Sequence, residues 1–252
     1  MRRNRKRDDL QQPNNRLIEQ KKIKKQSNKL KDANQKIKIL RITLVFMLLV
    51  LILLYFILRI VYDTGRFTVI LDSMSDVEAM IIMYEREGVK TSRRKLSANA
   101  LDFMTNISGA WIPEDVDSGS TGGSHNGDNY IAYTFYIENA GDEILHYWYE
   151  IQIDDIIKDV DEAIRVAVYL NGNKTVYAKP NKRTSQPEKD TIAFKNNEKV
   201  MLEQRQLFQP GEVDKFTIVI WIEGDDPECI DDLIGGEMKM HMVITEEHIE
   251  QK

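Results

Sequence analysis

The chain contains 252 residues with a formal net charge of -5, so it is long enough for one sizeable domain plus additional segments. The charge is unevenly distributed: residues 1–41 contain 15 Lys and Arg against 4 Asp and Glu, whereas residues 60–252 contain 19 against 36. A single cysteine, Cys229, excludes a disulfide within the chain. We expect it to be a small packing residue, with a disulfide to a second molecule as the alternative.

Residues 1–41 form a basic tail with few large apolar side chains. Such a composition cannot bury a core, so we expect a largely disordered or loosely helical cytoplasmic segment. Its Lys and Arg residues could contact nucleic acid, but beside a membrane span they set the orientation and contact anionic lipid headgroups. We therefore expect no nucleic-acid partner. Ile23, Leu30 and Ile37 recur every seven residues, which leaves open a short helical dimer seam.

The next segment predicts a transmembrane helix over residues 42–62. The run ITLVFMLLVLILLYFIL, from Ile42 to Leu58, contains 17 residues without a charge. At about 1.5 Å per helical residue, a segment of this length covers most or all of a hydrocarbon layer roughly 30 Å thick. Arg41 and Arg59 can extend toward the headgroups at its two ends. A buried core helix is disfavoured because no face of the segment is polar.

A cleaved secretory signal peptide is the main alternative, since it also combines a basic start with an apolar stretch. This apolar stretch exceeds the usual length, and no small-residue cleavage pattern follows it closely. We therefore expect an uncleaved, single-pass anchor in the cell membrane. The excess of positive charge before the span predicts a cytoplasmic N-terminus and an extracytoplasmic C-terminal domain.

Residues 63–106 are expected to form a juxtamembrane region with one strand and one short helix. The segment FTVIL, residues 67–71, has the composition of a strand. Four apolar residues then recur with the spacing of one helix face: Val77, Met80, Ile81 and Tyr84. Ser75 would cap this helix and Gly88 would end it.

Between residues 107 and 245 the apolar period changes to two, which is typical of strands. The alternating segments are 131–137, 144–153, 164–170, 175–178, 216–222 and 238–244. Asn171-Gly172 is a strong hairpin signal because both residues tolerate positive φ. The pattern predicts a mainly β fold, an antiparallel β-sandwich of jelly-roll or Ig-like type, followed by a polar tail over 246–252. The Gly- and Ser-rich segment 117–128 is expected to be a mobile connection.

Several of these segments resemble a known family. The stretches YTFYIENAGDEILHYWYEIQI, IRVAVYLNG and PGEVDKFTIVIWIEGDDPEC are similar to the extracellular β-sandwich proteins of the camelysin and TasA group, over roughly residues 107–245. The resemblance implies a secreted or surface-held protein of a Gram-positive bacterium, and some members build biofilm matrix fibres. Members are typically released by a dedicated signal peptidase, and no such cleavage site is apparent here. Some have been classed as metallopeptidases, but this sequence contains no HExxH motif.

The segment from Glu223 to Asp232 concentrates six carboxylates in ten positions. Calcium prefers six to eight oxygen ligands, so this segment is a candidate for a weak calcium site. The residues that would serve as ligands are Asp225, Asp226, Glu228, Asp231 and Asp232. They do not follow the spacing of an EF-hand loop, and Gly224 and Pro227 mark a turn that would be polar in any case. A solvated connection between strands, with no cofactor, is the alternative.

No other motif indicates catalysis. The four histidines, His125, His146, His241 and His248, are not spaced as ligand pairs, and no nucleophile elbow or phosphate-binding glycine loop is present. We therefore expect that the protein is not an enzyme. An exposed aromatic row could bind glycan or a partner, although such residues usually pack in the core. Its members would be Tyr133, Tyr136, Tyr147, Trp148 and Tyr149.

Taken in this order, the segments predict a single-pass membrane protein that holds a β-sandwich at the bacterial cell surface as a structural or interaction module. The expected partners are the lipid bilayer, anionic headgroups at the tail, and a cell-surface or matrix protein. A calcium- or glycan-binding surface module is the second hypothesis. An extracytoplasmic metallopeptidase is the third.

Overall fold

The computed structural model describes residues 5–61, 67–72, 80–101, 103–119 and 122–248. The chain divides into two compact units, one ending at Asp63 and the other beginning at Thr64. Within these residues, the first unit contains a single helix and the second contains the strands.

Helix α1 extends from Arg5 to Val61, a length of 57 residues. Of the two states expected for the tail over 1–41, largely disordered or loosely helical, the structure has the helical one from Arg5 onward. Lys, Arg, Gln, Leu and Ala are good helix formers, and a tail that continues an apolar helix does not need a nucleus of its own. The part of α1 from Lys29 to Ile57 is long and apolar enough to cross a membrane. The side chains from Ile42 to Ile57 are exposed.

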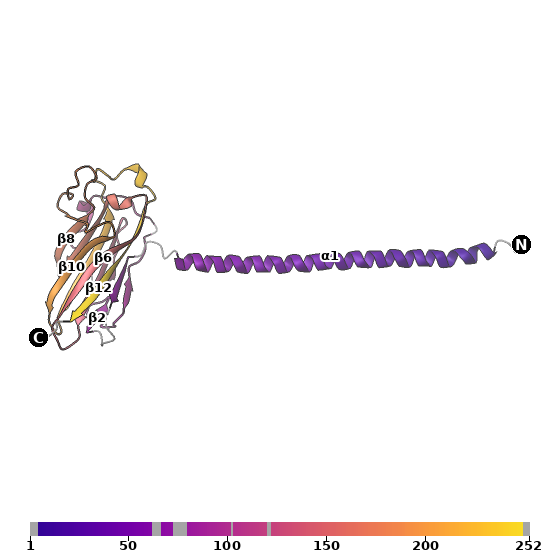
Figure 1. The fold of residues 1–252 in the computed structure, drawn as a ribbon, viewed down its shortest axis with the longest axis horizontal. Coiled ribbons are helices and arrows are strands. Elements are labelled where there is room, and N and C mark those ends of the chain that lie inside the picture. Colours follow the sequence, from indigo (N-terminus) through magenta and orange to yellow (C-terminus); the bar gives the residue numbers. More distant parts are fainter. Residues whose placement is uncertain (1–4, 62–66, 73–79, 102, 120–121, 249–252) are drawn as a thin grey trace. The chain divides into compact units, whose positions relative to one another are not determined.

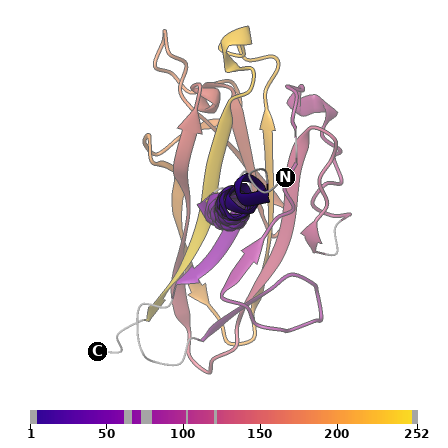
Figure 2. The ribbon, with the colours of Figure 1, turned by 90° about the vertical axis from the view of Figure 1, so that its right-hand side faces the viewer.

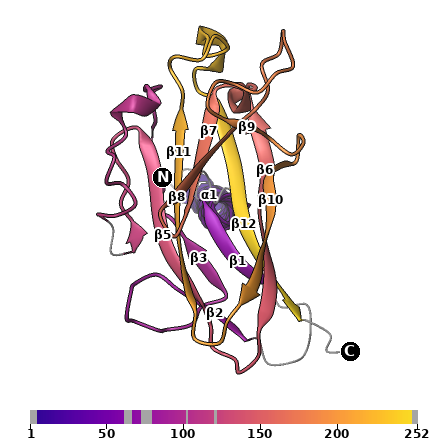
Figure 3. The same ribbon diagram turned by 90° about the vertical axis from the view of Figure 1, so that its left-hand side faces the viewer.

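The strands form two sheets (Figures 1 and 3). The first sheet has the order β10 (Lys199–Phe208), β6 (Leu145–Ile157), β12 (Glu237–His248), β1 (Thr68–Asp72) and β3 (Lys95–Ser97). The second has the order β2 (Ile81–Tyr84), β5 (Tyr130–Asn139), β11 (Val213–Ile222), β7 (Ile164–Leu170), β8 (Asn173–Ala178) and β9 (Ile192–Ala193), with β4 (Gly123–Ser124) on β5. Three short 3-10 helices occupy connections: η1 (Gly109–Trp111), η2 (Val160–Glu162) and η3 (Asp231–Leu233).

A continuous hydrophobic core includes side chains of both sheets, because alternate residues of each strand point to one face. At its centre Phe135 of β5 stacks on Phe216 of β11, with ring centroids 5.2 Å apart, and Tyr149 of β6 meets Phe216 edge to face at 5.3 Å. Such aromatic pairs add packing energy of about 0.5–1.5 kcal/mol each beyond area burial. The core therefore joins the two sheets through β5, β11 and β6.

The alternating segments expected from the sequence all form strands. The Asn171-Gly172 hairpin is confirmed, with φ values of 52° and 83° in the turn between β7 and β8. The sheets are nevertheless mixed rather than purely antiparallel, because β1 pairs with β12, and β8 with β9, in parallel. A parallel pair needs a long connection between its two strands, and β1 and β12 are far apart in the sequence.

The expected short helix around residues 77–84 is wrong for its described part. Ile81–Tyr84 is strand β2, paired with β5, while residues 73–79 lie outside the described residues. Ile81 and Met83 point into the core with exposures of 1% and 0%, so tertiary packing decides their conformation over a short helical spacing. The carboxylate of Glu246 also accepts a hydrogen bond from the Met80 backbone N–H at 3.1 Å.

The boundary expected at residue 107 does not separate two regions in the structure. Strands β1, β2 and β3 all lie before it, yet β1 pairs with β12 and β2 pairs with β5. Strand β3 extends the first sheet by pairing with β1. At the other end, β12 continues to His248, and Glu246 is buried, so the polar tail expected from 246 begins as part of a strand. Backbone pairing with β6 extends the strand there regardless of the polar composition.

The segment 117–128, expected to be a mobile connection, is fixed where it is described. Asp117 is buried and accepts a hydrogen bond from Thr217 at 2.6 Å, and β4 pairs with β5. The preceding segment packs Ile107, Ile112 and Val116 against a second cluster on the second sheet, which includes Ala132, Ala167 and Val219. Figure 2 shows the ribbon of this segment beside the strands. Residues 103–119 therefore cover that cluster rather than connecting strands loosely.

Substitution of Ile70 by Pro tests whether β1 is an integral strand. Ile70 lies between two strands, paired with Val243 of β12 and Lys95 of β3. Proline has no N–H for the ladder, so we expect Ile70→Pro to lower the free energy of unfolding by at least about 2 kcal/mol. Ile70→Thr, which keeps the backbone bonds, should lose about 1 kcal/mol or less. Urea unfolding of the full chain in detergent micelles measures both, and equal stabilities for the two variants would show that β1 is dispensable.

Candidate metal centre

The acidic segment connects β11 to η3 and is anchored by backbone hydrogen bonds to two other parts of the chain. The N–H of Glu223 donates to the carbonyl of Ala163 at 2.8 Å, and the N–H of Gly224 donates to the carbonyl of Ile107 at 2.8 Å. The turn is therefore held at the end of the second sheet, beside the start of β7. Fixed in this way, each carboxylate has a defined environment.

Two of the six carboxylates hold the chain in place. Glu223 accepts hydrogen bonds from the N–H of Gly109 at 3.0 Å and from the indole N–H of Trp221 at 3.0 Å. Asp225 accepts the hydroxyl of Ser108 at 2.6 Å. Both carboxylates thus attach η1 and its flank to the end of β11.

Asp226 forms a buried ion pair with Arg165 of β7. Their side chains are 0% and 6% exposed, and the guanidinium donates to one carboxylate oxygen. The other oxygen accepts the backbone N–H of Glu228 at 2.7 Å. A buried pair of this kind is costly to break because the remaining partner is left as an uncompensated charge.

The structure adds a carboxylate that the sequence did not associate with this segment. Glu188, from the connection between β8 and β9, lies with Asp226 and Glu228 so that one oxygen of each is within 4.8 Å of the others. Glu228 also accepts the backbone N–H of Lys182 at 2.9 Å, which attaches the two loops to each other. No spacing pattern links Glu188 to residues 226–228, so only the loop contact identifies it.

Asp231 and Asp232 do not join this group. Both are exposed in η3, on the far side of Cys229 in the sequence. Among the described residues, the group of three is therefore Glu188, Asp226 and Glu228, and only two of its members were expected.

Two oxygens of the group are buried without a protein partner. Glu188 Oε1 and Glu228 Oε2 make no hydrogen bond to any described residue. An unpaired buried carboxylate oxygen is expensive, and a cation that coordinates it removes that cost. Three carboxylates offer hard oxygen ligands. Such ligands suit calcium or magnesium better than zinc or copper. The remaining ligands of such an ion would be carbonyl oxygens or water.

The local charge balance also favours a cation at this group. Neighbouring Asp161 and Glu162 are matched by Lys179, whose ammonium lies 2.5 Å and 2.6 Å from their oxygens. Among the described residues, the ion pair made by a member of the group of three is the one between Asp226 and Arg165. Three carboxylates beside one guanidinium leave a net negative charge that a divalent ion would neutralise.

Cys229 lies next to this group but is a poor candidate ligand. Its sulfur accepts a hydrogen bond from the Asn106 amide at 3.4 Å, and the side chain is half-buried. Burial raises the pKa of the Cys229 thiol, which disfavours the thiolate that binds metals or attacks disulfides. The thiol is thus placed as a packing group, as the sequence analysis expected.

The histidines lie apart in the structure. His125 contacts the hydroxyl of Thr134 at 2.9 Å, His146 accepts the N–H of Leu207 at 2.9 Å, and His241 pairs with Asp154 at 2.9 Å. The side chain of His248 is outside the described residues. In the part of the chain that is described, no histidine joins a group of three metal-binding side chains.

The expected aromatic row does not form an exposed surface. Tyr133 and Tyr147 are fully buried and Tyr136 is 4% exposed, because their positions alternate into the two packed faces. Trp148 is 38% exposed and donates its indole N–H to Glu247 at 2.7 Å. Tyr149 is half-buried and lines a hollow between the sheets.

No protein-family model matches the sequence, and no curated protein matches it either. Two similar solved structures are crystal structures of the β-glucosidase of Kluyveromyces marxianus. The complex with glucose has a TM-score of 0.23 and 12% identity, and the match covers 68% of this chain and 15% of that chain. The selenomethionine-labelled form has a TM-score of 0.25 and 13% identity, and the match covers 68% of this chain and 17% of that chain. The chain therefore spans less than a fifth of that enzyme, and TM-scores this low carry no argument about fold or function.

Removing the Asp226 charge tests the structural role of the buried pair. We expect Asp226→Asn to lower the free energy of unfolding by about 3–5 kcal/mol, because Arg165 is left as a buried, unpaired cation. The exposed Asp232→Asn is the matched control and should change stability by less than about 0.5 kcal/mol. Urea unfolding of the full chain in micelles compares the two. A loss in Asp226→Asn no larger than in the control would contradict the buried pair.

Proposed function

We propose that the chain is a single-pass membrane protein that holds its β domain outside the cell as a structural or interaction module. The observation that carries the proposal is helix α1. Its segment Lys29–Ile57 is apolar and long enough to span a bilayer, and the apolar side chains from Ile42 to Ile57 are exposed. Such a surface is stable in lipid and is costly to leave in water.

The charge distribution supports the orientation. The 15 Lys and Arg of residues 1–41 precede the span, and positively charged flanks remain on the cytoplasmic side. There they would contact anionic lipid headgroups, each basic residue near the surface contributing about 1 kcal/mol. The acidic β domain would then face the extracytoplasmic side.

The architecture of the β domain supports a module that acts through its surface. From β5 onward the chain passes repeatedly between the two sheets, at β5 to β6, β6 to β7, β9 to β10, β10 to β11 and β11 to β12. Such crossings are typical of sandwiches of the jelly-roll or Ig-like types. The resemblance to the camelysin and TasA group agrees with a role at the surface of a Gram-positive bacterium. Its partner would be a cell-surface or matrix protein. The proposal includes no catalytic step.

The location is tested by protease access to two epitope tags, one before Met1 and one after Lys252. In protoplasts that express the full chain, added protease should remove the C-terminal tag and spare the N-terminal tag until the cells are lysed. The two tags serve as controls for each other, because they report on opposite sides of the same membrane. Protection of the C-terminal tag, or a trimmed β domain released into the medium, would contradict the membrane-held arrangement.

A calcium-binding role for the module is the second candidate function, favoured by the group of Glu188, Asp226 and Glu228. Its support is the pair of buried carboxylate oxygens that have no hydrogen-bond partner among the described residues. Bound calcium would attach the loop after β8 to the loop after β11, and so would stiffen one end of the domain. This revises the ligand set expected from the sequence by adding Glu188 and omitting Asp225, Asp231 and Asp232.

Calcium should raise the melting temperature of the full chain measured in detergent with chelator or with millimolar calcium. An ion at ten times its Kd stabilises the folded state by about 1.4 kcal/mol, which corresponds to a shift of about 3–5 °C for a domain of this size. Glu188→Gln should abolish the shift without lowering the melting temperature in chelator, because it removes a repelling charge. Asp232→Asn should retain the shift. If the parent protein shows no shift, the group is not a calcium site.

A further inference from the structure

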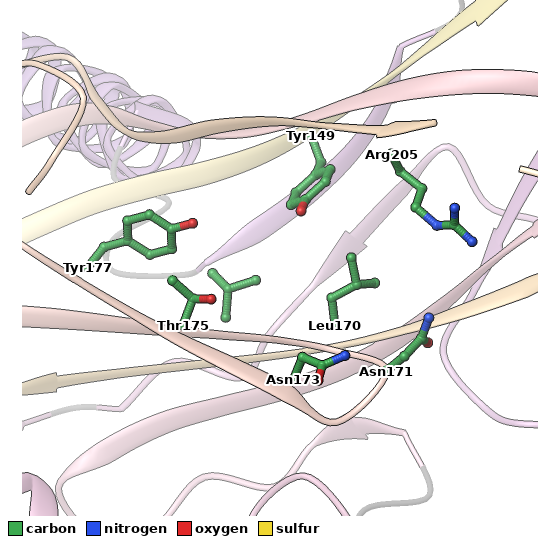
Figure 4. A pocket seen from close by; sticks show the side chains of 8 residues that line it. Tyr149, Leu170, Asn171, Asn173, Thr175, Tyr177 and Arg205 are labelled. Carbon is green, nitrogen blue, oxygen red and sulfur yellow. The ribbon is translucent and has the colours of Figure 1, made fainter. Parts of the chain in front are cut away.

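A hollow with a volume of about 330 Å³ opens between the two sheets beside the β7–β8 hairpin (Figure 4). Strands β7 and β8 of the second sheet form one side of the hollow. Strands β6 and β10 of the first sheet each contribute one residue to the other side. The lining residues are Tyr149, Val168, Leu170, Asn171, Asn173, Thr175, Tyr177 and Arg205. This hollow shares no residue with the candidate metal centre.

The hollow exists because the core-facing pattern changes from apolar to polar along the hairpin. Tyr177 pairs with Val166 and is buried in the core, whereas the next residue of that face, Thr175, pairs with Val168 and is only half-buried. Asn173 follows opposite Leu170 and is exposed. Short polar side chains at these positions do not fill the space between the sheets.

Three hydroxyl groups face the hollow and have no partner in the part of the chain that is described. Figure 4 shows the oxygens of Tyr149, Tyr177 and Thr175 directed toward the same space near Leu170. Tyr177 is only 5% exposed. A buried phenol normally has a hydrogen-bond partner, and here the hollow can supply it, either as water or as the polar group of a ligand.

These phenols remain protonated at any physiological pH. Burial and the nearby Glu203 carboxylate raise the pKa of Tyr149 to about 12 and also raise the pKa of Tyr177. A protonated phenol both donates and accepts a hydrogen bond, as does the hydroxyl of Thr175. The amide of Asn173 adds two donors and an acceptor at the rim.

Among the residues that line the hollow, none carries an unpaired charge. Its guanidinium, on Arg205, pairs with Glu212 and lies 3.2 Å from the carboxylate of Asp214. The amide of Asn171 also donates to Asp214, at 2.6 Å, which holds the turn of the hairpin in place. An anionic ligand would therefore compete with two carboxylates for Arg205, and a neutral ligand would not.

We propose that this hollow is a binding site for a neutral saccharide. A sugar ring has one C–H face and a rim of hydroxyls. Val168, Leu170 and the ring of Tyr149 supply apolar contact, while the hydroxyls of Tyr177 and Thr175 and the amide of Asn173 match the rim. The volume lies near the lower end of the roughly 300–1,000 Å³ range of small-molecule sites, which suits one or two sugar rings.

The inference goes beyond the proposed membrane-held module and does not depend on it. Sugar binding is measured on the purified full chain, whereas the location of the domain is measured by protease access in cells. Failure of either experiment therefore leaves the other result intact.

Saturation-transfer difference NMR on the full chain in nanodiscs of neutral lipid tests the site. The probes are glucose, N-acetylglucosamine and the N-acetylglucosamine trisaccharide, each at millimolar concentration, with glucuronic acid as the charged comparison. Tyr177→Phe and Thr175→Val each remove one hydroxyl and keep the shape of the side chain. Tyr169→Phe is the matched control, because Tyr169 lies on the opposite face of β7 and does not line the hollow.

We expect at least one neutral probe to bind, and each lining variant to bind it about fivefold more weakly, the factor for loss of one neutral hydrogen bond. Tyr169→Phe should bind as the parent does. Circular dichroism and the melting temperature confirm that each variant is folded, and Thr175→Val provides the test if Tyr177→Phe is not. Absence of binding by all neutral probes, binding of glucuronic acid alone, or unchanged affinity in folded lining variants would overturn the proposal.

Discussion

Pairing of the first and last strands within one sheet is the constraint on which the β domain depends. Strand β12 lies between β6 on one side and β1 on the other, and its inward residues Met240, Met242 and Ile244 are among the most buried of the core. Because β1 follows soon after helix α1 in the sequence, this pairing fixes the start of the domain against its end. Strand β12 therefore joins β6 and β10 on one side of the first sheet to β1 and β3 on the other.

The same β7–β8 hairpin contributes to both candidate sites, at opposite ends. Arg165, near the start of β7, pairs with Asp226 beside the carboxylate group, whereas Leu170, at the end of β7, lines the hollow. Both residues belong to β7, a strand of seven residues that is buried from Ile164 to Tyr169. An ion at one end and a sugar at the other would therefore act on one rigid element, which suits a module that binds rather than catalyses.

Both candidate sites contain polar groups whose hydrogen bonds the neighbouring apolar side chains cannot supply. At the loop end, two carboxylate oxygens are buried without a protein donor, and in the hollow a phenol that is 5% exposed has no partner among the described residues. The buried carboxylate oxygens cost stability in the free protein, which a cation would relieve. The hydroxyl in the hollow can exchange water for a ligand of matching chemistry. The cation suits the first, and a neutral polyhydroxylated ring suits the second.

Local patterns in the sequence determined the apolar helix, the strands with alternating residues and the Asn171-Gly172 hairpin, since each depends on residues close together in the chain. Only the tertiary structure decided that Ile81–Tyr84 is a strand, that β1 pairs in parallel with β12, and that Glu188 joins Asp226 and Glu228. These features are contacts between distant segments, and their energies come from burial and pairing that no local period records. The hollow beside Tyr177 is of the same kind, because a cavity forms only where two sheets meet.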